Sequence, residues 1–193
     1  VYDFGRDRAI RRFDFPGEVA VAAIDRLRSE HPGVMCGLET AYGWFVDKGR
    51  YDIVRQGRTP YETEPDGVGD VREFVRAEIT KLLVWHQDVP VRTLAQTLQG
   101  LPLHSTWSLP GLLEVVREDV NKRAALEHIA ADLGVAANDV AAFGDQHNDR
   151  EMLRWAGFGV AMGNADDEVK ALADFTTATC DEDGVAAVIE TWL

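Results

Sequence analysis

The sequence contains little that could cross-link the chain or anchor it in a membrane. Its two cysteines, Cys36 and Cys180, are far apart and form no metal-binding or redox motif, so we expect two reduced thiols. No apolar run is long enough to span a bilayer, and no signal peptide opens the chain. These absences predict a cytoplasmic protein without a membrane partner.

Basic residues are scarce relative to acidic ones. The chain has 20 Lys and Arg against 33 Asp and Glu, a formal net charge of -13. This excess argues against nucleic acid or an anionic membrane as a partner, because both would repel the chain. It is compatible with a small anionic ligand, since a metal ion or one lysine can invert the potential inside a site. The length of 193 residues allows one large domain or two small ones, and nothing indicates an oligomeric state.

Residues up to about 118 predict a mixture of helices, strands and hairpin-like turns, which is typical of a small α+β unit. Helical spacing of apolar residues between Pro16 and Pro32 is the clearest local pattern. The expected elements are strands at 1–4 and 9–13 about a turn at Gly5, a helix within 16–33, strands at 34–40 and 42–46, a loop at 47–70, a helix at 71–79, a strand at 80–86, a helix at 91–100, and strands at 103–108 and 112–116.

From residue 120 onward, strand and helix alternate with short loops. The expected elements are a helix at 121–133, a strand at 139–143, a helix at 149–156, a strand at 158–162, a helix at 166–173, a short strand at 175–178 and a helix at 184–192. Such alternation is the signature of a parallel, doubly wound sheet. We therefore expect an α/β unit here and a boundary near residue 118.

The segment FGDQHNDREML, residues 143–153, gathers acidic and amide groups directly after an apolar run. Asp145 follows the carboxyl end of the expected strand, the edge at which open α/β sheets bind ligands. Asn148 and Asp149 fall at the start of the next helix, where backbone N–H groups favour anions. A hard cation together with a phosphate suits this set, because Mg²⁺ prefers oxygen ligands and shares them with phosphate.

Two other interpretations apply to the same segment. Simple helix capping, with Asn148 or Asp149 as N-cap and Asp145 in a turn, is the default for such a loop taken alone. An EF-hand loop beginning at Asp145 fails, because its sixth position is Arg150 rather than Gly and its twelfth is Ala156 rather than Glu.

Lys122 supports the first interpretation. It begins the helix that leads into the acidic strand, so one helix and one strand bring it to the sheet edge of Asp145. A lysine there could neutralise phosphate charge and keep a carboxylate nucleophile ionised. The alternative is a solvated lysine on a helix surface, as most lysines are.

Two motifs extend this pattern: Gly-Asp-x-x-Asn-Asp-x-x-Met at residues 144–152 and Ala-Met-Gly-Asn-Ala at 161–165. Together with VNKRAAL at 120–126, they resemble the haloacid dehalogenase superfamily, and within it the Cof-type sugar-phosphatase branch with the large α/β cap. The resemblance implies three parts: a hairpin remnant of the core at 1–13, an α+β cap at 14–118, and the second half of a doubly wound, Rossmann-like core at 119–193. The cap region matches only by size and element order.

The resemblance also implies roles for individual residues. Asp145 would bind Mg²⁺, Asn148 would contact the phosphate, and Asp149 would orient its neighbours. Lys122 would contact the phosphoryl group, and Asn164 would bind substrate, although a plain turn residue is an equal alternative for Asn164. Family chemistry is attack of an aspartate on phosphorus, giving an aspartyl-phosphate that water hydrolyses while Mg²⁺ offsets charge.

The family's nucleophile lies in an Asp-x-Asp-Gly-Thr/Val motif near the N-terminus, and we find none there. The only match, at residues 181–185, precedes the last expected helix. We interpret it as a turn in which Asp181 or Asp183 caps that helix; a nucleophile at this position is the less favoured alternative. The sequence therefore suggests a chain that lacks its N-terminal part, and we expect it to show no phosphatase activity alone.

The expected function is that of a Mg²⁺-dependent phosphohydrolase acting on small phosphorylated metabolites such as sugar phosphates. One alternative is a non-catalytic binding protein that retains the cap and half of the core. Another is a phosphomutase, or a sucrose- or trehalose-phosphate-type phosphatase. In the cap, Tyr42 and Trp44 could stack on a sugar ring, but ordinary packing on a sheet face is the preferred interpretation.

Overall fold

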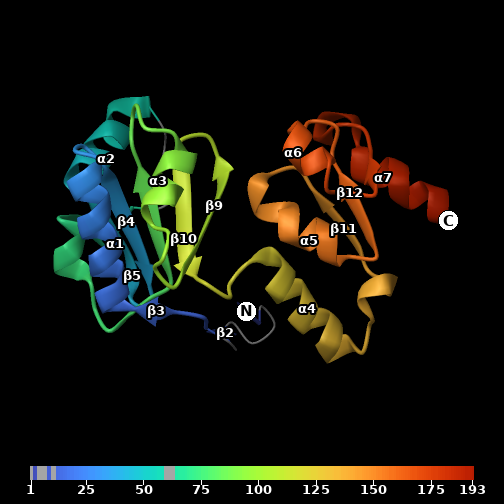
Figure 1. Cartoon of the computed structure of the whole chain (residues 1–193), viewed down its shortest axis with the longest axis horizontal. Coiled ribbons are helices and arrows are strands. Elements are labelled where there is room, and N and C mark those ends of the chain that lie inside the picture. The colour runs from blue at the N-terminus through green and yellow to red at the C-terminus, as the bar shows by residue number, and fades with distance from the viewer. Residues whose placement is uncertain (1, 4–7, 10–11, 59–63) are drawn as a thin grey trace. The chain divides into compact units, whose positions relative to one another are not determined.

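The structure is a computed structural model that describes residues 2–3, 8–9, 12–58 and 64–193. The chain divides into two compact units, Val1–Asp119 and Val120–Leu193 (Figure 1). Each unit has its own buried core. No helix among the described residues is long and apolar enough to cross a bilayer. The two units differ in architecture, and each is described by itself.

Unit 1 is built on a six-stranded sheet in the order β6-β5-β4-β8-β10-β9. Neighbouring strands pair antiparallel except β5 and β6, which are parallel. Two short antiparallel ladders, β1 with β2 and β3 with β7, complete the strands. Their bounds are β1 (Tyr2–Asp3), β2 (Arg8–Ala9), β3 (Phe15–Pro16), β4 (Met35–Thr40), β5 (Gly43–Asp47), β6 (Gly67–Gly69), β7 (Glu78–Ile79), β8 (Lys81–Trp85), β9 (Leu103–Leu109) and β10 (Leu112–Arg117). The α+β class predicted for this part is confirmed, whereas the turn expected at Gly5 lies outside the described residues.

The described part of unit 1 contains the α-helices α1 (Gly17–Glu30), α2 (Lys48–Ile53) and α3 (Val91–Thr97). Of these, α1 and α3 pack on one face of the six-stranded sheet. α1 follows Pro16, whose restricted φ suits the start of a helix. Its apolar side chains fall on one face and share a core with α3 and the strands; this core includes Ala20, Ala23, Ile24, Leu27, Cys36, Leu38, Leu82, Val84, Leu94, Leu113 and Val115. Full burial of each large aliphatic side chain contributes about 1.5–3 kcal/mol, so this core holds α1 and α3 on the sheet.

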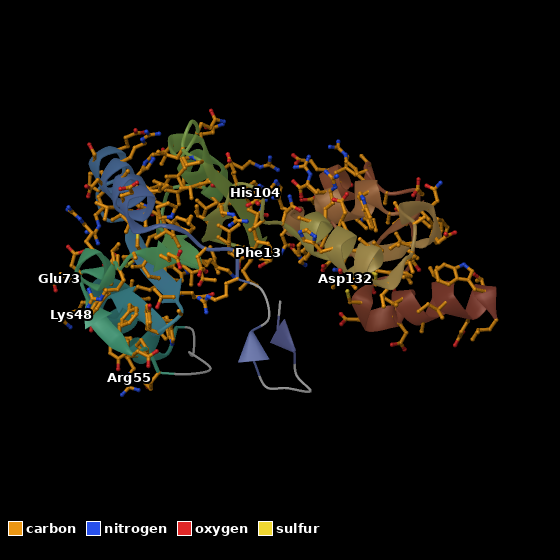
Figure 2. The ribbon with its side chains drawn as sticks, turned by 90° about the horizontal axis from the view of Figure 1, so that it is seen from below. Phe13, Lys48, Arg55, Glu73, His104 and Asp132 are labelled. Atoms are coloured by element: carbon orange, nitrogen blue, oxygen red, sulfur yellow. The ribbon has the colours of Figure 1, made fainter. Side chains whose placement is uncertain are left out.

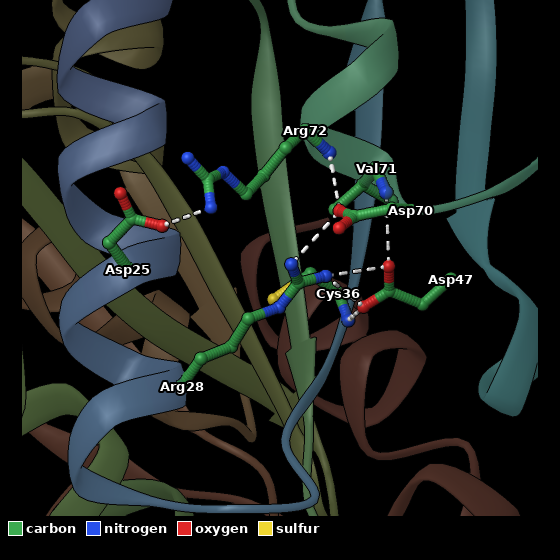
Figure 3. A network of polar contacts seen from close by, with 7 residues as sticks. All are labelled: Asp25, Arg28, Cys36, Asp47, Asp70, Val71 and Arg72. Carbon is green, nitrogen blue, oxygen red and sulfur yellow. Dashed lines mark hydrogen bonds and ion pairs between the residues drawn. The ribbon is translucent and has the colours of Figure 1, made fainter.

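A buried carboxylate, Asp47, joins three parts of unit 1 (Figure 3). It is 7% exposed and accepts the backbone N–H groups of Cys36 at 2.7 Å and Val71 at 3.0 Å. Arg28 of α1 donates to both oxygens of Asp47, at 2.9 and 3.1 Å, and to Asp70 at 2.9 Å. Because Asp47 lies before and Val71 lies after the same inserted segment, the network fixes both ends of that segment against α1.

The prediction that residues 47–70 form a loop is wrong. The segment contains α2, a π-helical turn (Val54–Arg58) and β6. The polar composition of the segment gives no local signal for these elements, because tertiary contacts, such as burial of the Val54 side chain, hold them in place rather than local propensity. The charged side chains of Lys48 and Arg55 lie at the surface of the unit, as Figure 2 shows.

The prediction of a helix at 71–79 is also wrong, because only its first residues form a helical turn. Residues Val71–Phe74 form a 3₁₀ turn capped by Asp70, whose carboxylate accepts the Arg72 N–H at 3.0 Å. The chain then enters β7, which pairs with β3. The partner strand lies far away along the chain, so the local pattern of residues 71–79 contains no signal for it.

Unit 2 contains a parallel sheet of three strands in the order β11-β12-β13. Figure 1 shows β11 and β12 side by side. The elements in chain order are α4 (Lys122–Leu133), β11 (Ala141–Gly144), α5 (Arg150–Trp155), β12 (Phe158–Ala161), α6 (Asp167–Lys170), β13 (Phe175–Thr176) and α7 (Gly184–Ile189). The α/β class and the parallel sheet predicted from the alternating pattern are confirmed.

Several elements of unit 2 are shorter than predicted. Two 3₁₀ turns, Ala137–Asp139 and His147–Asp149, take the first residues of the predicted strand and helix. A third, Glu190–Trp192, replaces the end of the last helix. The 3₁₀ turn is the tighter form of helix and is common at helix ends, where the hydrogen-bond ladder stops.

The core of unit 2 consists mainly of small side chains, namely Ala142, Leu153, Ala156, Ala161, Ala165 and Val169. Small residues allow backbones to approach closely, and a Cβ at Gly159 would lie only 3.0 Å from the carbonyl carbon of Leu153. This packing fixes α5 against β12. It therefore fixes the short loop between β11 and α5, in which the acidic motif lies.

Candidate active site

The carboxylate of Asp149 organises the end of β11. It is 3% exposed, and its Oδ2 accepts the backbone N–H groups of Asp145 at 3.1 Å and Gln146 at 3.0 Å. Lys122 donates from Nζ to Oδ1 at 2.5 Å. A buried anion with three donors is fully paired, which is the condition for tolerating a charge inside a protein. Asp149 therefore holds the loop and the lysine in place.

Gly144 provides the space that this carboxylate occupies. A Cβ built on Gly144 would lie 2.7 Å from Cγ of Asp149, closer than real side-chain contacts allow. The strand ends in glycine because the Asp149 side chain folds back against it. Glycine at position 144 of the motif is thus explained by the close approach of the Asp149 side chain.

Lys122 is the first residue of α4. The preceding Asn121 is the N-cap, and its side chain accepts the Ala124 N–H at 2.8 Å, which sets where the helix begins. The Lys122 side chain reaches Asp149 yet remains 49% exposed. Within the described part of the chain Asp149 is its one hydrogen-bond partner, and an ammonium group has three donor protons. The exposed side of the ammonium can therefore bind an anion.

Asp145 lies directly after β11 with a half-buried side chain. Its Oδ2 accepts from Asn164 Nδ2 at 2.8 Å and from Gln146 Nε2 at 3.3 Å. Among the residues that the structure describes, none donates to Oδ1. The arrangement leaves one oxygen of this carboxylate for a ligand. The sequence had no signal for the contribution of Gln146, which the motif treats as a variable position.

Asn148 has a buried Oδ1 atom without a hydrogen-bond partner among the described residues. A buried acceptor left unpaired costs about 1–3 kcal/mol, and such atoms call for a functional explanation. The capping interpretation is wrong for Asn148, because Gln146 is the N-cap of the 3₁₀ turn and Asp149 that of α5. Its amide is therefore suited to a ligand at the same strand end.

These side chains fit Mg²⁺ by donor type. Asp145 offers a carboxylate oxygen and Asn148 an amide oxygen, whereas Asp149 is committed to Lys122 and the backbone. The described residues contain no group of three or more His, Cys, Asp or Glu arranged to hold a metal ion. Mg²⁺ suits such a sparse set, because it keeps several waters and combines one or two carboxylates with a substrate phosphate.

The Asp181–Val185 match is part of a turn at the start of a helix, as predicted. Residues Cys180–Glu182 form a 3₁₀ turn, and Glu182 accepts the N–H of Thr179 at 3.1 Å and its O–H at 2.8 Å. Asp183 adopts a left-handed φ of 56° before α7. Asp183 is the N-cap residue of α7, one of the two predicted alternatives, although its side chain makes no capping hydrogen bond. Glu182 instead completes the capping box of the preceding 3₁₀ turn.

Unit 1 has a hollow of about 710 Å³ between α2 and the ends of β4, β8, β9 and β10. It is lined by Met35, Arg50, Ile53, Trp85, His86, Gln87, Asp88, Leu109, Pro110, Gly111 and Leu112, and therefore includes neither aromatic residue considered for sugar stacking. Tyr42 is 76% exposed, so the interpretation as sheet packing is wrong for it. Trp44 is half-buried and donates from Nε1 to the Glu64 carbonyl at 3.2 Å.

Comparison with known proteins identifies the family of the chain. A family model described as haloacid dehalogenase-like hydrolase matches residues 3–189. The 5-amino-6-(5-phospho-D-ribitylamino)uracil phosphatase YitU of Bacillus subtilis is 40% identical over 128 residues, which are 64% of this chain and 47% of that enzyme. The chain thus spans about half the length of this relative.

Two solved structures have a similar fold. The subclass IIB sugar phosphatase BT4131 is similar with a TM-score of 0.82 and 22% identity, over 97% of this chain and 70% of that one. The phosphatase BT1666 of Bacteroides thetaiotaomicron is similar with a TM-score of 0.76 and 26% identity, over 96% of this chain and 68% of that one. The fold expected from the motifs is confirmed.

Proposed function

The chain belongs to the haloacid dehalogenase-like hydrolases, and from this membership we propose that its site serves the Mg²⁺-dependent hydrolysis of small phosphorylated metabolites such as sugar phosphates. The observation that supports the proposal best is the grouping of Asp145, Asn148 and Lys122 around the buried Asp149 at the end of β11. The similar proteins include one named as a sugar phosphatase, which supports the substrate class.

Each of these residues has a separate task in the proposal. Asp145 would hold Mg²⁺, and the bound ion would offset negative charge on the phosphoryl group. Nδ2 of Asn148 and the exposed side of Lys122 donate hydrogen bonds to phosphoryl oxygens, while the unpaired Oδ1 of Asn148 would serve the metal ion or a water that the ion holds. Asp149 contacts neither metal nor phosphate and orients Lys122 and the loop.

Hydrolysis also needs a carboxylate nucleophile. Its oxygen forms a bond to phosphorus while the ester P–O bond breaks, and the leaving oxygen takes a proton; water then cleaves the aspartyl-phosphate. None of the four side chains is assigned this task, because each is committed to the metal, the phosphate or the loop.

Metal and phosphate binding test this assignment directly. We expect the chain to bind Mn²⁺, a paramagnetic substitute for Mg²⁺, in electron paramagnetic resonance titrations, with Mg²⁺ as competitor. Asp145→Ala should abolish the binding, whereas Asp139→Ala, which removes an exposed carboxylate of the same unit, should not change it. Lys122→Met should keep Mn²⁺ binding but weaken that of inorganic phosphate to the Mn²⁺-loaded chain. The proposal fails if the unaltered chain binds no Mn²⁺ or if Asp145→Ala binds it equally well.

Turnover separates the alternatives. The complete gene product, incubated with Mg²⁺ and a panel of phosphorylated sugars and nucleotides, should release inorganic phosphate. A phosphomutase would isomerise a sugar phosphate without net release. A binding protein would do neither, although it would still bind phosphate.

A further inference from the structure

We infer that Asn164 is a positioning residue that aims the Asp145 carboxylate at the metal ion, an inference that rests on the proposed function. Asn164 lies in the loop after β12 and contacts two separate segments. Its Nδ2 donates to Asp145 Oδ2 at 2.8 Å, and its Oδ1 accepts the backbone N–H of Cys180 at 2.9 Å. The side chain therefore connects the metal-binding carboxylate to the turn before α7.

The direction of the Asn164 amide follows from its two partners. The Cys180 N–H can only donate, and an ionised Asp145 carboxylate can only accept. Only one of the two amide orientations satisfies both. Both polar atoms of the amide thereby have a partner in the protein, and the role that we infer for Asn164 acts through Asp145, whereas the family resemblance implies a substrate contact.

The anchor at Cys180 makes Asn164 the more rigid of the two donors to Asp145. The other donor, Gln146, contacts the same Oδ2 at 3.3 Å. The turn that contains Cys180 is held by a reciprocal contact between Thr179 and Glu182. With Oδ2 held on this anchored amide, Oδ1 has a defined direction for a metal ion. Losing such a supporting hydrogen bond typically weakens metal affinity 10–100-fold.

Replacing the amide tests the first link. Asn164→Ala should weaken Mn²⁺ binding about tenfold while the thermal midpoint of the chain changes little, since the residue is exposed. Asn138→Ala removes an exposed asparagine of the same unit that has no contact with Asp145, and it should bind Mn²⁺ like the unaltered chain.

Replacing the anchor tests the second link without touching Asn164. Cys180 is the first residue of a 3₁₀ turn, and the preceding Thr179 has extended dihedrals of φ -70° and ψ 167°. Both positions accept proline, so Cys180→Pro removes the N–H with little backbone strain. It should weaken Mn²⁺ binding, but less than Asn164→Ala. The matched variant Cys180→Ser keeps the N–H and should bind normally.

The outcomes separate this inference from the proposed function. If the unaltered chain binds Mn²⁺ and Asn164→Ala binds it equally well, the positioning role is wrong while the metal site stands. If Cys180→Pro and Cys180→Ser bind alike, the anchor at Cys180 is wrong. An unaltered chain that binds no Mn²⁺ removes both proposals. A loss of affinity in Asn164→Ala that parallels a loss of folded protein at the assay temperature would indicate a merely structural role and overturn the inference.

Discussion

The Nζ atom of Lys122 lies 2.5 Å from Oδ1 of Asp149, which pairs a half-exposed cation with a carboxylate that is almost fully buried. The same carboxylate accepts two backbone N–H groups of the loop after β11. One ion pair thus joins the start of α4 to the loop that contains the site. The contact that stabilises unit 2 therefore also places the Lys122 ammonium at the site.

Lys122→Met should destabilise unit 2. The substitution keeps a long side chain but leaves the buried Asp149 without its cationic partner. Breaking a buried ion pair costs about 3–5 kcal/mol, and the exposure of Lys122 reduces this figure, so we expect a loss of about 1–3 kcal/mol. Urea unfolding followed by circular dichroism measures the change.

The neighbouring residue provides the control for that experiment. Arg123 pairs with Glu127 at 3.3 Å on the half-exposed surface of α4. Arg123→Ala should change the free energy of unfolding by less than about 0.5 kcal/mol, as is usual for such pairs. Equal losses in the two variants would show that Asp149 does not depend on Lys122.

Asp47→Ala should severely destabilise unit 1. The change leaves the buried N–H groups of Cys36 and Val71 without their acceptor and leaves Arg28 with Asp70 alone, and we expect a loss of about 3–5 kcal/mol. Asp47→Asn, which keeps one acceptor oxygen, should lose less and provides a measurable variant if Asp47→Ala does not fold. The control is Asp52→Ala, because Asp52 pairs with Lys48 at the surface. A loss in Asp47→Ala no larger than in the control would contradict the role of this network.

The stability of unit 1 should fall in acid. Burial would raise the pKa of the Asp70 carboxyl, but hydrogen bonds from the Arg72 N–H and the Arg28 guanidinium outweigh it and lower that pKa. Likewise, burial would raise the pKa of Asp14, but contacts with Arg12 and Thr80 lower it. A lowered folded-state pKa stabilises the fold above the unfolded value of about 4, and this stabilisation is lost as pH falls through the folded value.

Urea midpoints between pH 7 and pH 3 measure this dependence. We expect a plateau above about pH 5 and a decline below about pH 4. Asp70→Asn should be less stable at pH 7 and should lose less stability between pH 7 and pH 3 than the unaltered chain. Parallel pH curves for the two proteins would rule out Asp70 as a source of the decline.

Local sequence signals were sufficient to predict an element where its own residues decide where it begins and ends. Asn121 and Gly134 bound α4 as N-cap and left-handed C-cap, and the helix begins one residue later than predicted. Alternation of short apolar strands and helices with short loops predicted the parallel sheet of unit 2, because parallel neighbours need a crossover connection, usually a helix.

The prediction failed where distant residues decide the outcome. Asp47 was included in an expected loop, yet it is buried because Arg28 and two backbone N–H groups converge on it. β7 forms because β3 supplies its partner. Neither contact has a local pattern in the chain.

The sequence by itself determined the family, the α/β class of unit 2, and the set of side chains at the end of β11, because these follow from short-range spacing and motif. Only the tertiary structure decided how those side chains are paired. Lys122 contacts Asp149 rather than standing directly beside Asp145, and Asn164 connects Asp145 to Cys180. The reason is that a difference of a few tenths of an ångström between donor and acceptor decides whether a hydrogen bond forms. Such distances are set only when strands and helices far apart in the chain have packed.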